Sequence, residues 1–187
     1  MDGVITNPVT GAAMMACSRN GTLLTVPGDY RYGPTRVFAV ERETGRRVTL
    51  IDDRYVAFPG LSPDGRRLVL HGSAANDQVL VFDIERKTLI RVSDGPGNDI
   101  LPIWGPSGDR VVFTTDRSGA EEIAWAPAGG GGPVETLIEA IGLPQDAFSW
   151  SADGSRLAFN RGIRTARDIW VLDLESKTGP EPFLESS

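Results

Sequence analysis

Few residues in this chain of 187 amino acids could carry acid–base or nucleophilic chemistry. His71 is the single histidine and Cys17 the single cysteine. A Ser-His-Asp site would need His71 as its base, but the sequence has no Gly-x-Ser-x-Gly elbow to hold a nucleophile. We therefore interpret His71 as a loop residue that makes ordinary hydrogen bonds, and we expect no catalytic residue and no enzymatic activity.

Metal and phosphate binding have little support in the sequence. The segments "SPDG" and "SADG" offer one carboxylate each and "DRSGAEE" offers three, but none matches a calcium-binding loop. The pair Asp52 and Asp53 is adjacent in sequence, so on a strand the two side chains point to opposite faces. The glycine-rich "AGGGGP" lacks the Gly-Lys-Ser/Thr ending of a phosphate-binding loop. The sequence predicts no metal and no cofactor.

Four charged residues share a recurring position. Glu122 and Asp168 each lie fourteen residues after the last glycine of a turn, and Arg117 and Arg164 lie in the loops before them. Equivalent positions at the start of a strand favour structural contacts with neighbouring loops. The same four residues could instead rim a surface that binds a ligand or partner. We take Arg117, Glu122, Arg164 and Asp168 as the candidate binding residues.

The segments that position these residues repeat along the chain. The turns "SRNG", "SPDG", "GPSG" and "SADG" begin at Ser18, Ser62, Gly105 and Ser151, so successive turns are 44, 43 and 46 residues apart. Each turn precedes an apolar segment such as "RRLVL" or "SRLAF". A near-constant period in this range is typical of a repeat architecture.

Each repeat has the composition of short strands. Valine, isoleucine, phenylalanine and tryptophan are enriched in runs separated by turn residues. The segment 133–143 ("PVETLIEAIGL") has helical composition, but it lies where other repeats place their last strand. We predict a strand over 134–138, with "AGGGGP" as the loop before it. Four antiparallel strands per period correspond to one blade of a β-propeller.

Aromatic residues recur at two places in the repeat. Some precede the turns and others lie in the third strands, and in a propeller such residues fill the space between blades. We expect inter-blade packing for Phe58, Phe82, Trp104, Trp125, Phe148, Trp150 and Trp170.

The phrases "LSPDGRRLVL" and "WSADGSRLAF", followed by "DRSGAEEIAWAP" and "TARDIWVLDL", resemble the WD40-like Pro-Asp repeats of TolB-type β-propellers. The resemblance covers nearly the whole chain, with degenerate turns in the first and third repeats. The phrasing looks most similar to propellers fused to bacterial serine/threonine protein kinases. The resemblance implies a non-catalytic scaffold that binds protein or peptide at the channel mouth or on loops of one face.

The resemblance also implies that this propeller is incomplete. TolB-type propellers usually have six blades, whereas we predict one all-β segment over 1–187 with four blades at approximately 13–53, 57–97, 101–141 and 146–187. Residues 1–12 look like the remnant of a preceding blade. Because an open arc exposes apolar sheet faces, we expect self-association as a dimer, two arcs completing a ring of eight blades. A closed ring of four blades is the alternative.

Charge and hydropathy restrict the partners. The net charge is −6 and the sequence pI is near 4.8, which argues against nucleic acid. No run of 18 apolar residues and no secretory signal is visible, so we predict no membrane insertion. As written, the chain is expected to be cytoplasmic, or extracytoplasmic if it is part of a larger membrane-anchored protein.

These observations favour a non-catalytic propeller that serves as a scaffold for protein or peptide binding. One alternative is the propeller portion of a prolyl-oligopeptidase-like hydrolase without its catalytic domain. Another is a propeller that binds a small molecule or sugar.

Overall fold

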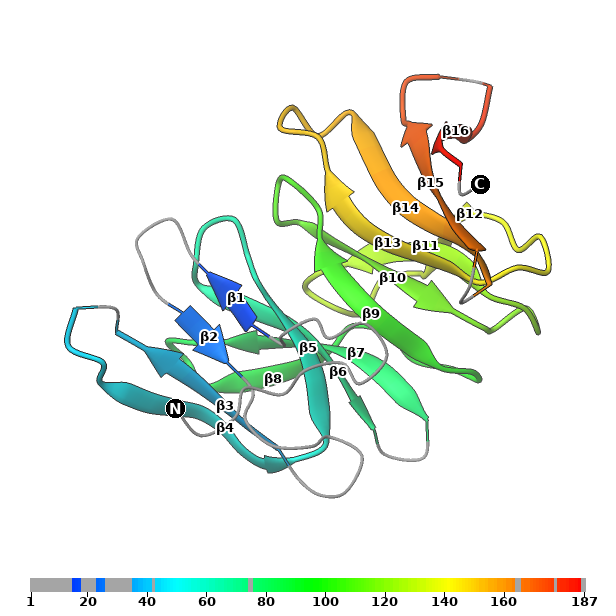
Figure 1. Cartoon of the computed structure of the whole chain (residues 1–187). Coiled ribbons are helices and arrows are strands. Elements are labelled where there is room, and N and C mark those ends of the chain that lie inside the picture. Colours follow the sequence, from blue (N-terminus) through cyan, green and yellow to red (C-terminus); the bar gives the residue numbers. More distant parts are fainter. Residues whose placement is uncertain are drawn as a thin grey trace.

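A computed structural model describes residues 15–17, 23–25, 35–41, 43–73, 76–163, 166–176 and 178–185. All regular elements in this part of the chain are strands, which form four antiparallel sheets arranged as an open arc (Figure 1). The first two sheets are β1 (Met15–Cys17), β2 (Leu23–Thr25), β3 (Thr35–Val40), β4 (Arg47–Arg54) and β5 (Val56–Leu61), β6 (Arg67–Ser73), β7 (Asp77–Asp83), β8 (Thr88–Arg91). The last two are β9 (Asp99–Trp104), β10 (Arg110–Thr115), β11 (Glu122–Pro127), β12 (Glu135–Ile138) and β13 (Gln145–Trp150), β14 (Arg156–Ile163), β15 (Ala166–Asp173), β16 (Glu181–Leu184).

The arc confirms the predicted fold class, an incomplete all-β propeller of four blades. Its first and fourth sheets lie at opposite ends of the arc (Figure 1), so the alternative of a closed four-bladed ring is wrong. The predicted remnant of a preceding blade, residues 1–12, lies outside the described residues. The described part of the chain has no helix, and hence none able to cross a membrane.

The predicted turns that begin at Ser62, Gly105 and Ser151 connect the first strand of a sheet to the second, and the one that begins at Ser18 lies outside the described residues. In the second sheet the Gly65 amide donates to the Ser62 carbonyl at 2.8 Å, and the Arg67 amide donates to Ser62 Oγ at 2.9 Å. Gly65 has a φ of +73°, a conformation that glycine adopts without steric cost. The fourth sheet repeats this turn, with the Arg156 amide bound to Ser151 Oγ at 3.0 Å. The turn residues therefore fix the register of the first two strands.

The predicted strand near the glycine-rich segment is confirmed as β12, and the glycines precede it in a loop. The interpretation of His71 as a loop residue was wrong. His71 lies within β6 and is only 7% exposed, because the strand continues through it to Ser73. The apolar run of β6 stops before His71, but the strand does not, because its pairing with β7 continues through His71 and Gly72 to Ser73.

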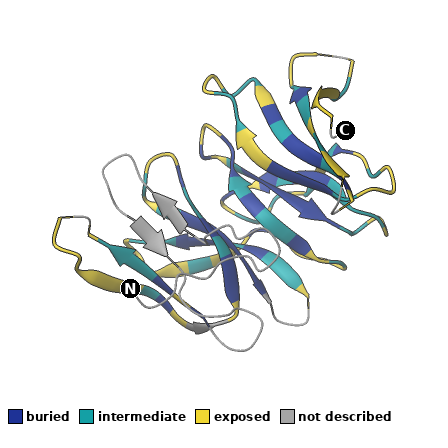
Figure 2. Cartoon of the chain, in the orientation of Figure 1, coloured by how far each residue is buried: buried dark blue, intermediate teal, exposed yellow. Residues whose placement is uncertain are grey.

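The core consists of three apolar seams between neighbouring sheets, which we number in chain order. Val37, Leu68 and Phe82 belong to the first seam. Val69, Val81 and Trp104 belong to the second seam, and Val112, Phe159 and Leu172 to the third. Figure 2 shows buried positions concentrated on the strands and exposed positions at hairpins and on β16. Each sheet is thus stabilised mainly by its neighbours in the arc.

Most of the predicted aromatic residues do pack at these seams. Trp104 and Phe82 are buried there, and Phe58, Trp125, Trp150 and Trp170 are partly buried against the same clusters. The prediction was wrong for Phe148, which is 57% exposed. A register shift between Ala147 and Ser149 marks a bulge at this residue, and a bulge re-aims a side chain.

Candidate functional site

The predicted binding residue Arg117 is held in an ion pair within the third sheet. Its Nη2 lies 2.7 Å from Asp99 Oδ2 and its Nε lies 3.1 Å from Asp99 Oδ1. Hydrogen bonding to Asp99 raises the pKa of Arg117 above its ordinary value. The Asp99 side chain is only 2% exposed, so the pair positions the loop after β10 against the start of β9. This ion pair is the kind of contact that the structural reading of Arg117 predicts, and it does not test whether Arg117 also binds a ligand.

Glu122 and Asp168 occupy matching positions in neighbouring sheets. Glu122 begins β11 opposite Thr115, and Asp168 lies in β15 opposite Arg161. Glu122 also helps to raise the pKa of Arg117 through its negative charge, which brings these two residues into one electrostatic cluster. Arg164 lies outside the described residues. The role of these four residues in ligand binding stays a prediction.

Two buried carboxylates at this end of the sheets escaped sequence reasoning. Asp99 binds Arg117, and Asp146 binds Arg167 Nη1 at 2.6 Å. Asp146 also accepts a hydrogen bond from Thr114 Oγ1 at 3.3 Å, across the third seam. The available signal was an aspartate directly before the apolar part of a first strand, in "NDILPIW" and "QDAFSW". A buried carboxylate in such a place needs a partner.

His71 is placed to join two sheets rather than to act as a base. Its Nδ1 accepts a hydrogen bond from the Leu101 amide at 3.1 Å, which links β6 to β9. Burial lowers its pKa from 6.5 to about 4, against a smaller opposing effect of Asp77. A catalytic base must reach the proton it removes, and His71 has its Nδ1 occupied and its ring buried. No group of three or more His, Cys, Asp or Glu placed to hold a metal is found among the described residues.

An apolar groove of about 630 Å³ lies along the first strands of the last three sheets. Its wall includes Trp104 from β9, Phe148 and Trp150 from β13, and prolines from the connecting turns and strands. Phe58 and Leu101, at matching positions of β5 and β9, both have a φ of +53° beside a bulge. Such backbone strain in residues other than glycine is concentrated at functional sites. We refer to this surface as the groove.

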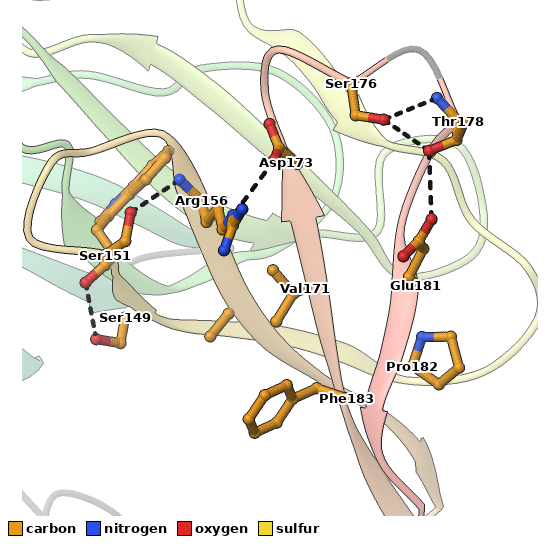
Figure 3. Close-up of a pocket in the computed structure, with 13 residues that line it drawn as sticks. Ser149, Ser151, Arg156, Val171, Asp173, Ser176, Thr178, Glu181, Pro182 and Phe183 are labelled. Atoms are coloured by element: carbon orange, nitrogen blue, oxygen red, sulfur yellow. Dashed lines mark hydrogen bonds and ion pairs between the residues drawn. The ribbon is translucent and has the colours of Figure 1, made fainter.

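A second hollow, of about 690 Å³, lies on the open face of the fourth sheet. Figure 3 shows Arg156, Val171 and Phe183 on this face, with a 3.3 Å ion pair between Arg156 Nε and Asp173 Oδ2. Ser149 and Ala158 complete the part of the hollow nearest to β13. Phe183 is 75% exposed. We refer to this surface as the end-sheet pocket.

Comparison with known proteins places these surfaces in context. A family model described as the TolB beta propeller domain matches residues 14–179. Tricorn protease homolog 1 of Streptomyces coelicolor is 30% identical over 131 residues, which are 70% of this chain and 12% of that protein. The Tol-Pal system protein TolB of Anaeromyxobacter dehalogenans is 32% identical over 76 residues, 40% of this chain and 16% of that protein. The chain therefore spans only a small part of each relative.

Solved structures show the same fold at low identity. TolB from Acinetobacter baumannii has a TM-score of 0.75 at 20% identity and covers 100% of this chain, which corresponds to 44% of that chain. A TolB homologue from Agrobacterium tumefaciens has a TM-score of 0.78 at 18% identity, over 96% of this chain and 67% of that one. A prolyl endopeptidase has a TM-score of 0.66 at 16% identity, over 90% of this chain and 29% of that enzyme.

Proposed function

The chain belongs to the TolB β-propeller family, and from that premise we propose that it is a non-catalytic scaffold that binds protein or peptide. The groove is the observation that carries this proposal. It is an exposed apolar surface in a part of the chain where the only histidine is buried and engaged. Such a surface on a rigid sheet scaffold is typical of an interaction site.

The groove suits an extended peptide with apolar side chains. Trp104 and Trp150 give it flat walls, and the ring of Phe148 projects from its bulged strand with 57% of its surface exposed. Aromatic and proline residues bind such peptides at a low entropic cost, because few of their bonds must be immobilised. The charged rim, with Arg117, Glu122, Arg164 and Asp168, is proposed as a second contact region. The described members of the rim lie at the other end of the strands from the turns that border the groove.

A peptide-display selection against the chain tests this function. We expect selected peptides to bind the Phe148→Ala variant at least about 10-fold more weakly than the unmodified chain. Ile141→Ala is the matched control, because Ile141 is also an exposed apolar residue, at 51%, but lies outside the groove. Glu122→Gln in the same series tests the rim. A selection that yields no binder, or binders indifferent to Phe148, would contradict a role for the groove.

Similarity to a tricorn protease homologue and to a prolyl endopeptidase favours one alternative. In that case the propeller would be the non-catalytic part of a peptidase, and the groove would bind the substrate of that peptidase. If the same gene also encodes a catalytic domain, the protein that contains both parts should cleave the selected peptides.

We also propose that the chain self-associates as a dimer. On the face of the fourth sheet that carries Val171, Ile169 is 40% exposed and Phe183 is 75% exposed, and solvent exposure of such large apolar side chains is unfavourable. Pairing with a second copy would cover such a surface. The predicted ring of eight blades is one arrangement, and a two-fold contact between like sheets is another.

A further inference from the structure

The second seam shows how one sheet of this protein holds an aromatic residue of the next. The Trp104 indole donates to the Gly60 carbonyl at 3.0 Å, and Arg67 Cζ lies 4.8 Å from the centre of the indole ring. Val69 and Val81 form the apolar floor of this contact and are fully buried. Arginine, two apolar side chains and a first-strand carbonyl therefore form a receptor for an aromatic ring.

The end-sheet pocket has the same set of positions. Gly60 faces Val69 across the first two strands of the second sheet, and Ser149 faces Ala158 at the same place in the fourth sheet. The strand register therefore matches Gly60 with Ser149 and Val69 with Ala158. By the same register Arg67 matches Arg156 and Val81 matches Val171. All four fourth-sheet residues line the end-sheet pocket. The pocket is thus the receptor of the second seam repeated on a face that no sheet formed by the described residues covers (Figure 1).

Arg156 is available for such a contact. In the third sheet the matching Arg110 lies over Trp125, with 4.1 Å between its Cζ and the ring centre. In the fourth sheet the position of Trp125 is occupied by Val171, which offers no ring. Among the described residues, Arg156 makes no cation–π contact, and its side chain is 63% exposed.

An aromatic side chain lies on the same face. Phe183 lines the end-sheet pocket and is the most exposed large apolar side chain of the described residues, at 75%. Figure 3 shows its ring standing over the sheet beside Val171. A face that carries both a receptor and an exposed ring is self-complementary, because a two-fold rotation brings each ring to the other receptor.

We propose that two copies of this chain dimerise face to face through their fourth sheets, with Phe183 of each copy bound over Val171 and Ala158 and beneath Arg156 of the other. This inference rests on the self-association proposed above and specifies its surface. It replaces the ring of eight blades, in which the first and fourth sheets would meet. Burial of the phenyl ring and its contact with the guanidinium both stabilise the dimer.

Light scattering over a range of concentrations, with three variants, tests the proposal. We expect Phe183→Ala to raise the dimer dissociation constant about 100-fold, because a two-fold dimer loses two contacts of about 10-fold each. Arg156→Ala should raise it about 20-fold. Arg36→Ala is the matched control, since Arg36 forms a similar exposed ion pair with Asp52 on the first sheet, and it should leave the dimer unchanged.

Mixing the two variants shows whether Phe183 of one copy contacts Arg156 of the other, or whether the two residues affect the dimer independently. A mixed dimer of Phe183→Ala and Arg156→Ala chains keeps one complete ring–arginine contact. It should therefore be tighter than either variant homodimer, beyond the twofold statistical factor, in native mass spectrometry. A mixed dimer of intermediate strength would overturn the contact. A dimer sensitive to Arg36→Ala but not to Arg156→Ala would overturn this surface and leave self-association standing, whereas a monomer at all concentrations would overturn both.

Discussion

The second and third seams contain the same types of residue and use them differently. At the second seam the Trp104 indole has a carbonyl partner on the preceding sheet, and Arg67 lies over its ring. At the third seam the matching Trp150 is partly buried, but its indole nitrogen has no hydrogen-bond partner among the described residues. The indole nitrogen of Trp170 also has no hydrogen-bond partner among the described residues. Two seams with one repeat sequence thus differ in how well their polar groups are satisfied.

Two substitutions within the repeat accompany this difference, because Ile103 stands where the second sheet has Gly60, and Trp125 stands where it has Val81. The ring of Trp125 lies at the third seam with Arg110 Cζ 4.1 Å from its centre, so at this seam the arginine contacts Trp125 and not the tryptophan of the next sheet. Glu135 strengthens this arrangement by accepting a hydrogen bond from the Trp125 indole at 2.9 Å. A repeat residue therefore takes its role from its neighbours in register, and not from its place in the motif alone.

Acid should weaken the second seam more than the third, because His71 spans the second. The unfolded chain binds a proton at this histidine below pH 6.5, whereas the folded chain resists until about pH 4. Stability is therefore lost as pH falls through this window, by about 3 kcal/mol when the histidine is fully protonated in both states. Urea unfolding at pH 7 and pH 4 measures the loss.

The His71→Gln variant is the control, since a glutamine oxygen can still accept a hydrogen bond but does not titrate. Subtracting its pH profile removes the contribution of the carboxylates. Equal slopes for the two proteins between pH 6.5 and pH 4 would show that His71 is protonated in the folded state.

Tryptophan-to-phenylalanine substitutions should also distinguish the two seams, by a change in the free energy of unfolding that is smaller than the effect of acid. Trp104→Phe leaves the partly buried Gly60 carbonyl without its donor, and we expect a loss of about 1 kcal/mol in the free energy of unfolding. Trp150→Phe removes an indole nitrogen that has no hydrogen-bond partner in the described part of the chain, so the free energy of unfolding should change little apart from the effect of the smaller ring. Chemical denaturation of both variants checks this. Equal losses would contradict the described difference.

The sequence predicted the repeats, the strands and the seams because these depend on local patterns. Turn residues at a near-constant period define the hairpins, and alternating apolar residues define which faces are buried. Trp104 could be placed at a seam for this reason. The periodicity continues through the glycine-rich segment, so β12 was recognised as a strand despite its helical composition.

The candidate sites were less accessible to sequence reasoning, because they depend on contacts between distant strands. Arg117 was identified as a charged residue of interest, but its partner Asp99 lies in another strand, 18 residues away. The exposure of Phe148 depends on a bulge, and burial of His71 on a strand longer than its apolar run. The end-sheet pocket needed the register of all four strands before its likeness to the second seam was visible.

A double-mutant cycle on the arginine–tryptophan pairs tests most directly the claim that the second seam contains an aromatic receptor that the third seam lacks. The cycle compares Arg67→Ala and Trp104→Ala with Arg110→Ala and Trp150→Ala, each alone and combined, by urea unfolding. We predict a coupling free energy of about 1 kcal/mol for Arg67 with Trp104, and none resolved for Arg110 with Trp150. Equal coupling in both pairs, or none in either, would contradict the account and remove the basis for the end-sheet pocket as a receptor.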